Sequence, residues 1–186
     1  DVEELYSIGA QPCFGVFPVD EMITKYIPEE KKDWLHIMKD TTARSRQMYQ
    51  SLRTMTSYFT KKGIVKLLET GIIDELPHEV PVIIEHGDRK KLLGMLIQSI
   101  RRKEIKAYLL DEQKILFPVE LIIHAYSFTE VNFIYMSERK ETCFILKEQS
   151  LSRSVYSFLT DLKESTYVLG IEETLEYLEK IYSSFK

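Results

Sequence analysis

The sequence predicts a mixed α+β (α/β) fold, in which a mixed parallel and antiparallel sheet packs with helices behind a helical N-terminal segment. The chain has 186 residues, of which 44% are hydrophobic, and a low content of Gly and Pro, which together exclude a disordered or fibrous protein. Apolar residues recur at helical spacing before residue 77, whereas short β-branched runs dominate after it. We therefore expect a helical segment over residues 1–76 and a mixed-sheet α/β domain over residues 77–186.

The N-terminal segment is expected to begin as an irregular packed arm, because glycines and prolines interrupt the apolar residues of 1–19. A helix is predicted to start at Pro28, and a longer one at Thr42. Gly63 is expected to interrupt that longer helix, and Gly71 to close the next one in a left-handed cap. The apolar face predicted for the longer helix consists of Met48, Leu52, Met55 and Phe59.

The remaining chain predicts a sheet with both parallel and antiparallel parts. A strand over 80–85, a helix from Asp88 and a strand over 105–111 make a parallel unit. Three further strands, with connectors short enough only for hairpins, are predicted over 120–127, 130–137 and 141–148. Two helices follow: Ser150 is the expected N-cap of the first, and the second starts after Gly170.

Charge is nearly balanced along the whole chain, with 25 Lys and Arg against 29 Asp and Glu and a net charge of −4. This composition argues against a protein that coats a polyanion. Residues 39–66 nevertheless hold seven basic residues and one acid, so Arg44, Arg46 and Arg53 are nucleic-acid candidates; a solvated helix face is the favoured explanation.

Cys13 and Cys143 are too few and too distant for a disulfide framework, which predicts reduced thiols. Neither a signal peptide nor an apolar stretch of membrane-spanning length is present, so we expect a cytoplasmic protein without membrane contact. The chain begins at Asp1 rather than Met, and we expect it to be a fragment or a processed chain.

Catalytic motifs are absent from the sequence, which predicts a protein that is not an enzyme and uses no metal or cofactor. Phospholipase-D-type nucleases place Lys two residues after His, and none of the four histidines here is followed in that way. His124 lies in an apolar strand, where a core or pocket position is the favoured role. With Tyr126 and Tyr108 it forms the candidate set for ligand binding, although strand aromatics usually belong to the core.

Residues 59–67 are the place where a helix-turn-helix could be imagined, since a glycine separates two expected helices among several cations. The second of these helices offers mainly apolar side chains, whereas reading DNA needs polar groups that reach base edges. We favour a helix break within a bundle.

Four segments resemble the C-terminal region that follows the helix-turn-helix in some bacterial XRE-type transcriptional regulators. They are TKKGIVKLLETGIIDELP (60–77), IKAYLLDEQKILFPVELIIHAYS (105–127), ILKEQSLSRSVYSFLTDLKES (145–165) and GIEETLEYLEKIYSSF (170–185). The resemblance implies a sensory or oligomerising effector domain whose DNA-binding domain lies upstream. It brings no catalytic or ligand residue with it.

The sequence therefore favours a non-enzymatic regulatory domain of a transcriptional regulator, which senses a small molecule or a regulatory protein, forms a homodimer, or does both. DNA contact would come only from the upstream domain. One alternative is an enzyme or enzyme relic of phospholipase-D-like architecture without its catalytic motif, with a site built from residues such as His124, Glu120 and Tyr126. The other is a purely structural dimerisation module.

Overall fold

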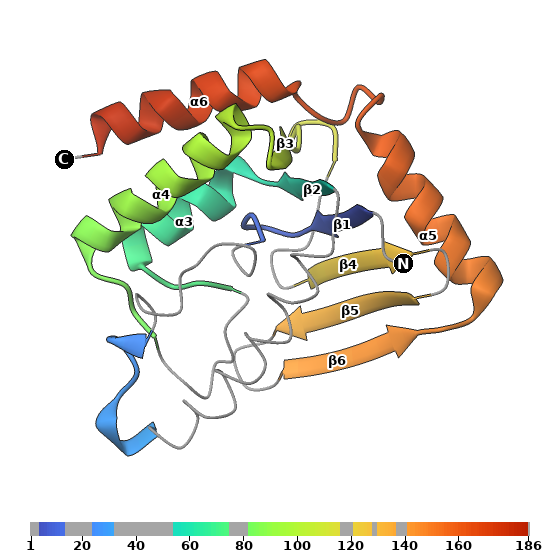
Figure 1. The fold of residues 1–186 in the computed structure, drawn as a ribbon, viewed down its shortest axis with the longest axis horizontal. Helices are drawn as coiled ribbons and strands as arrows, with labels where there is room; N and C mark the ends of the chain where they lie inside the picture. Colours follow the sequence, from blue (N-terminus) through green and yellow to red (C-terminus); the bar gives the residue numbers. More distant parts are fainter. Residues whose placement is uncertain are drawn as a thin grey trace.

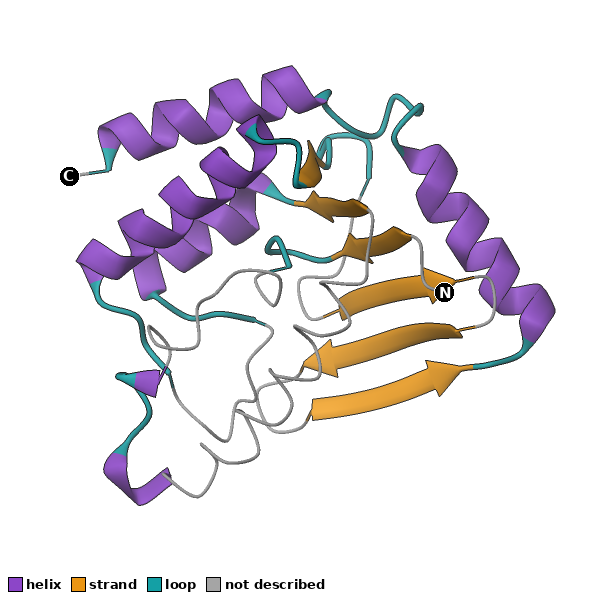
Figure 2. Ribbon diagram, viewed as in Figure 1, coloured by secondary structure: helices purple, strands orange, loops and turns teal. Residues whose placement is uncertain are grey.

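The computed structural model describes residues 4–13, 24–31, 54–74, 82–115, 121–127, 130–136 and 141–185. These residues form one six-stranded sheet with helices on both faces (Figures 1 and 2), so the mixed α+β fold predicted from the sequence is confirmed. The elements in chain order are β1 (Glu4–Ile8), η1 (Glu29–Lys31), β2 (Thr54–Phe59), α3 (Lys61–Thr70), α4 (His86–Arg101), β3 (Ile105–Leu109), β4 (Leu121–Ser127), β5 (Glu130–Met136), β6 (Glu141–Leu146), α5 (Gln149–Leu162) and α6 (Ile171–Ser184).

The strand order is β3-β2-β1-β4-β5-β6, and the sheet has two halves of different character. β1, β2 and β3 run parallel, whereas β4, β5 and β6 form an antiparallel meander joined to β1 (Figure 1). The predicted hairpins are therefore confirmed, with strand ends within two residues of the expected ones.

Two predictions before residue 77, an irregular arm over residues 1–19 and a helix from Thr42 that carries Met55 and Phe59, are wrong where the structure describes these segments. Residues of the expected arm form β1, which lies inside the sheet between β2 and β4. Residues of the expected long helix form β2, so Met55 and Phe59 face the core from a strand. Both faces of β1 and β2 are covered, and buried residues on both faces hide the alternation that marks a strand. The sheet therefore extends beyond residues 77–186.

Gly63 lies inside α3 and does not interrupt a helix, which corrects the prediction for this residue. The helix begins after Thr60, whose hydroxyl accepts a hydrogen bond from the Gly63 N–H at 2.9 Å. A Cβ at Gly63 would lie 1.8 Å from the carbonyl oxygen of Ala10, so the close approach of β1's following loop requires glycine. Gly71 closes α3 at φ 74, as predicted.

The strand predicted over 80–85 is also wrong where the structure describes it, because residues 82–85 hold only one isolated bridge, from Ile83 to Ile72. The parallel neighbour of β3 is instead β2, and α3 and α4 lie in the connection between them. α4 itself is confirmed, and buries the predicted apolar side. Its buried hydrophobic residues are Leu92, Leu93, Leu96, Ile97 and Ile100.

Two hydrophobic clusters lie on the two faces of the sheet. The first includes Leu5, Met55 and Phe59 and packs against α3, α4 and α6. The second includes Tyr6 and Tyr58 and packs against α5, which contacts β1, β4 and β5. Figure 2 shows the helices in these two groups. The sheet therefore lies in the middle of a three-layer arrangement.

The last two helices begin at different kinds of cap. The N-cap of α5 is Glu148 rather than the predicted Ser150, because the Glu148 carboxylate accepts hydrogen bonds from the N–H groups of Ser150 and Leu151. α6 starts after Gly170 as predicted, and the Glu173 carboxylate accepts from the Gly170 N–H at 2.9 Å.

Candidate functional site

A row of polar residues crosses the sheet where its parallel half meets its antiparallel half. The strand register places Ser57 of β2 opposite Ser7 of β1, Ser7 opposite His124 of β4, and His124 opposite Asn132 of β5. Residues opposite one another share a face of the sheet. The two serines and His124 are at most 7% exposed, so this polar row is a buried line among apolar neighbours.

Burial determines the chemistry of His124. Removal of the imidazole from water lowers the pKa of His124 to about 4, so the ring is neutral at pH 7. Next to it, the side-chain oxygen of Asn132 is buried and accepts no hydrogen bond. A neutral imidazole of such low basicity is poorly suited to taking up protons at neutral pH. The polar row is better suited to recognising a polar group than to acid–base catalysis.

The three predicted ligand residues do not form one site. Tyr108 lies on the opposite face from His124, because it stacks on Tyr58 at 5.4 Å within the cluster that α5 covers. Burial there raises the pKa of Tyr108. The backbone of Tyr126 belongs to β4, but its side chain lies outside the described part of the structure, and so does Glu120. Only His124 remains as a described candidate on its face.

The nucleic-acid candidates are not tested by the structure. Arg44, Arg46 and Arg53 lie outside the described residues. Residues 59–67, however, are not a pair of helices around a glycine, since Phe59 ends β2 and α3 continues through Gly63. Among the residues that the structure describes, no three His, Cys, Asp or Glu side chains are grouped as metal ligands.

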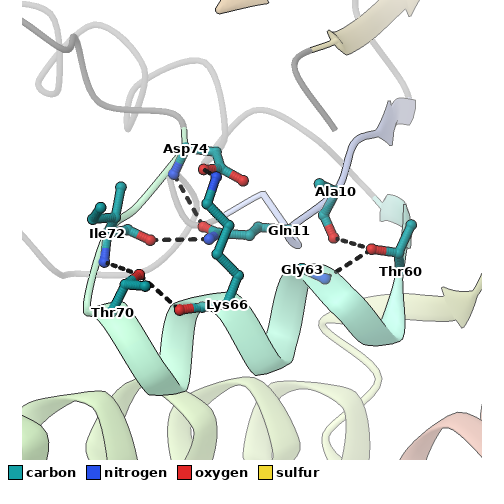
Figure 3. A network of polar contacts seen from close by, with 8 residues as sticks. All are labelled: Ala10, Gln11, Thr60, Gly63, Lys66, Thr70, Ile72 and Asp74. Carbon is teal, nitrogen blue, oxygen red and sulfur yellow. Dashed lines mark hydrogen bonds and ion pairs between the residues drawn. The ribbon is translucent and has the colours of Figure 1, made fainter. Parts of the chain in front are cut away.

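A second polar cluster joins the end of β1 to α3 and to the segment after it (Figure 3). The Gln11 amide nitrogen donates to the Ile72 carbonyl at 2.9 Å, and its oxygen accepts from the Asp74 N–H at 3.0 Å. Lys66 then pairs with the Asp74 carboxylate at 2.8 Å. These contacts join three segments and so fix the loop geometry at the carboxyl ends of β1 and β2, while the second carboxylate oxygen of Asp74 is buried without a hydrogen-bond partner.

The two edges of the sheet differ. At the carboxyl end of β3, residues 167–169 pair with residues 109–111: the Asp111 N–H donates to the Tyr167 carbonyl at 2.7 Å, and the Leu169 N–H donates to the Leu109 carbonyl at 2.8 Å. In contrast, β6 pairs only with β5 within the described chain. The edge strand β6 carries Phe144 and Ile145, each 52% exposed.

Large exposed side chains also lie on two other elements, β5 and α5. They are Tyr135 on β5, at 44% exposed, and Leu151 and Phe158 on α5, at 54% and 52%. Phe144 and Tyr135 lie on the face of the sheet that α5 covers, whereas Ile145 lies on the other face. Exposed large apolar side chains on adjacent elements are typical of association surfaces. Sequence reasoning missed these exposed side chains because local patterns show neither the position of β6 at the sheet edge nor which side of α5 faces the sheet.

A groove of about 800 Å³ also lies between α4 and α6. Arg101 on its wall donates to the Glu179 carboxylate at 2.7 Å, and Lys91 pairs with Asp88 at 2.7 Å. Hydrogen bonds from Lys25, Lys91 and other neighbours hold the pKa of Asp88 well below its usual range. The cations of this groove therefore already have acidic partners within the chain.

None of the helices in the described ranges combines the length and the apolar character that crossing a membrane requires. Comparison of the chain with models of protein families, with curated proteins and with solved structures found no match.

Proposed function

We propose that this chain is a non-enzymatic regulatory domain of a cytoplasmic bacterial transcriptional regulator and that it acts by self-association. A helix-turn-helix elsewhere in the same polypeptide would bind DNA, and association would bring two such units together. The observation that carries this proposal is the outer edge of β6, which pairs with no other strand of the described residues and carries Phe144 and Ile145 half exposed. The resemblance of four segments to the effector region of XRE-type regulators supports it.

The contrast between the two edges of the sheet supports the proposal of self-association through β6. An open sheet edge offers unpaired N–H and C=O groups to another strand, and proteins usually cover such edges or place charges and prolines on them. Residues 167–169 pair with the carboxyl end of β3, whereas β6 contains no proline and a single charged residue, Glu141, at its first position. A largely apolar edge strand that is left unpaired on one side by the described residues supports use of β6 for binding.

A sensing role for the same domain rests on the polar row. Asn132 keeps a buried oxygen without a hydrogen-bond partner, and a buried polar group in that state lowers stability unless something binds it. A small molecule with an N–H or O–H donor would satisfy that oxygen beside His124. Its binding would favour one arrangement of β4 and β5, which lead directly to β6.

The association is tested by light scattering on the purified chain and on two variants. The wild-type chain is expected to be a dimer and Phe144→Lys a monomer, because a charge would replace an apolar side chain at the association surface. Tyr167→Lys is the matched control: Tyr167 is 46% exposed near the carboxyl end of β3, at the opposite edge of the sheet, so its variant should remain a dimer.

The regulatory part is tested separately in the full-length protein. A reporter driven by the neighbouring promoter should respond to deletion of the regulator, and Phe144→Lys should reproduce that deletion while Tyr167→Lys should not. A wild-type chain that stays monomeric at all concentrations, or a promoter indifferent to deletion, would remove the basis of the proposal.

A further inference from the structure

We infer that β6 pairs antiparallel with β6 of a second copy of this chain, about a two-fold axis that passes beside Phe144. This inference rests on the proposed function and deepens it by naming the partner and the register. The two sheets would then form one continuous sheet, with the α5 helices of both copies on the same face, because the axis stands perpendicular to the sheet.

Symmetry restricts the registers that such a pair can adopt. In antiparallel strands, neighbouring opposite pairs alternate between two hydrogen-bonding types, so a two-fold axis must place some residue opposite its own copy. Within the middle of β6, that residue is Cys143, Phe144 or Ile145. Registers in which residues 143 and 144 oppose each other are excluded.

Charge complementarity selects among the three registers, which are centred on Cys143, Phe144 or Ile145. Centred on Phe144, the register places Lys147 of one copy across from position 141 of the other, which is a glutamate, and symmetry makes this pair twice. Centred on Ile145, Lys147 faces position 143, a cysteine, and the charges have no partner across the interface. In the register centred on Cys143, Lys147 would lie opposite a position that precedes β6 of the other copy. Opposite charges across strands stabilise a pair, so Phe144 is the centre.

The described side chains are arranged for this register. Phe144 stacks on Phe133 of β5, with ring centroids 4.8 Å apart and planes 4° apart, so its ring is held in place before a partner arrives. An ordered aromatic side chain loses little conformational freedom on binding. Lys147 is 70% exposed and lies 3.6 Å from the Glu130 carboxylate, so its ammonium group remains accessible to a second acid.

Disulfide trapping tests the register residue by residue. Opposite residues in antiparallel strands have Cα atoms roughly 4.5 to 5.5 Å apart, which is within the range that a disulfide bridges. In a Cys143→Ser background, Phe144→Cys should form a covalent dimer under copper–phenanthroline oxidation. Ile145→Cys in the same background is the matched control, with the same exposed fraction, and should remain uncrosslinked. With Cys143 retained, Ile145→Cys should crosslink, because positions 145 and 143 oppose each other.

A charge reversal gives an independent test. Lys147→Glu should raise the dimer dissociation constant about tenfold, since two attractive pairs become repulsive. Adding Glu141→Lys should restore dimerisation, and this recovery cannot come from the contact between Lys147 and Glu130 within one copy. Failure of the double variant to recover would contradict the register.

The outcomes separate the two proposals. A dimer by light scattering that Phe144→Cys fails to trap, or that Ile145→Cys traps without Cys143, overturns the Phe144-centred pairing and leaves self-association intact. A wild-type chain that is monomeric by light scattering and gives no crosslink in any variant overturns both.

Discussion

His124 should make the stability of this protein depend on pH. The imidazole has an ordinary pKa of 6.5 and a pKa of about 4 in the folded chain, because burial disfavours its charged form. The unfolded chain therefore binds a proton at a higher pH than the folded chain does. The contribution to stability is complete above pH 6.5 and is lost as the pH falls from 6.5 towards 4.

The size of this effect follows from the two pKa values. Each pKa unit corresponds to about 1.4 kcal/mol, so the whole loss is about 3 kcal/mol. At pH 5 the unfolded imidazole is almost fully protonated and the folded one hardly at all, and the free energy of unfolding should already be lower by about 2 kcal/mol. This is a large share of the 5 to 15 kcal/mol that is typical of natural domains.

Urea unfolding at pH 7 and at pH 5 measures this loss. His124→Gln should remove about 2 kcal/mol of the pH dependence, whatever it does to stability at pH 7. His86→Gln is the control for the replacement of a histidine by glutamine, because His86 is exposed at the start of α4. If His124→Gln loses as much stability between pH 7 and pH 5 as the wild type does, the neutral buried imidazole is refuted.

Two further substitutions test the packing around the sheet. Gly63→Ala should lower the free energy of unfolding, measured in urea, by more than about 2 kcal/mol, because its Cβ would meet the Ala10 backbone. Gly87→Ala is the control: nothing lies within 4 Å of its new Cβ, so the free energy of unfolding should not fall. An equal loss in both would contradict the close approach. Tyr58→Phe should cost about 1 kcal/mol by the same measurement, because the buried Tyr58 hydroxyl donates to the Leu159 carbonyl at 2.6 Å, and an unchanged value would mean that this bond adds nothing.

The antiparallel half of the fold was predictable because its signals are local. The strands of the meander are short apolar runs with connectors that permit only hairpins, and α4 and α6 show apolar residues at helical spacing. Gly71 closes α3 by a backbone conformation that favours glycine. Each of these signals lies within a few residues of the feature that it predicts.

The parallel half of the sheet was harder to predict, because its strands are stabilised by pairing with segments that are distant in the sequence. Met55 and Phe59 are four residues apart, which suits one face of a helix as well as alternate positions of a strand. Only pairing with β1 and β3 decides between them. A strand buried on both faces shows no polar alternation, and so the sequence pattern alone favoured the helix.

The candidate site was predictable only in part for the same reason. The prediction of a core or pocket position for His124 is confirmed by its burial. That Tyr108 lies on the other face depends on the register of β3 against β2, and the row from Ser57 to Asn132 depends on four strands together. Such lateral neighbours are far apart in the chain and leave no mark on local spacing.

The backbone of residues 167–169 limits how large an assembly can grow. A sheet with two open edges can add copies at both ends, and repeated addition produces a fibre. Here residues 167–169 already cap the carboxyl end of one edge strand, β3, and pairing through β6 would use the other edge, which is unpaired in the described sheet. The assembly would then stop at two copies, and its stoichiometry would be set by the capped edge rather than by the one that binds.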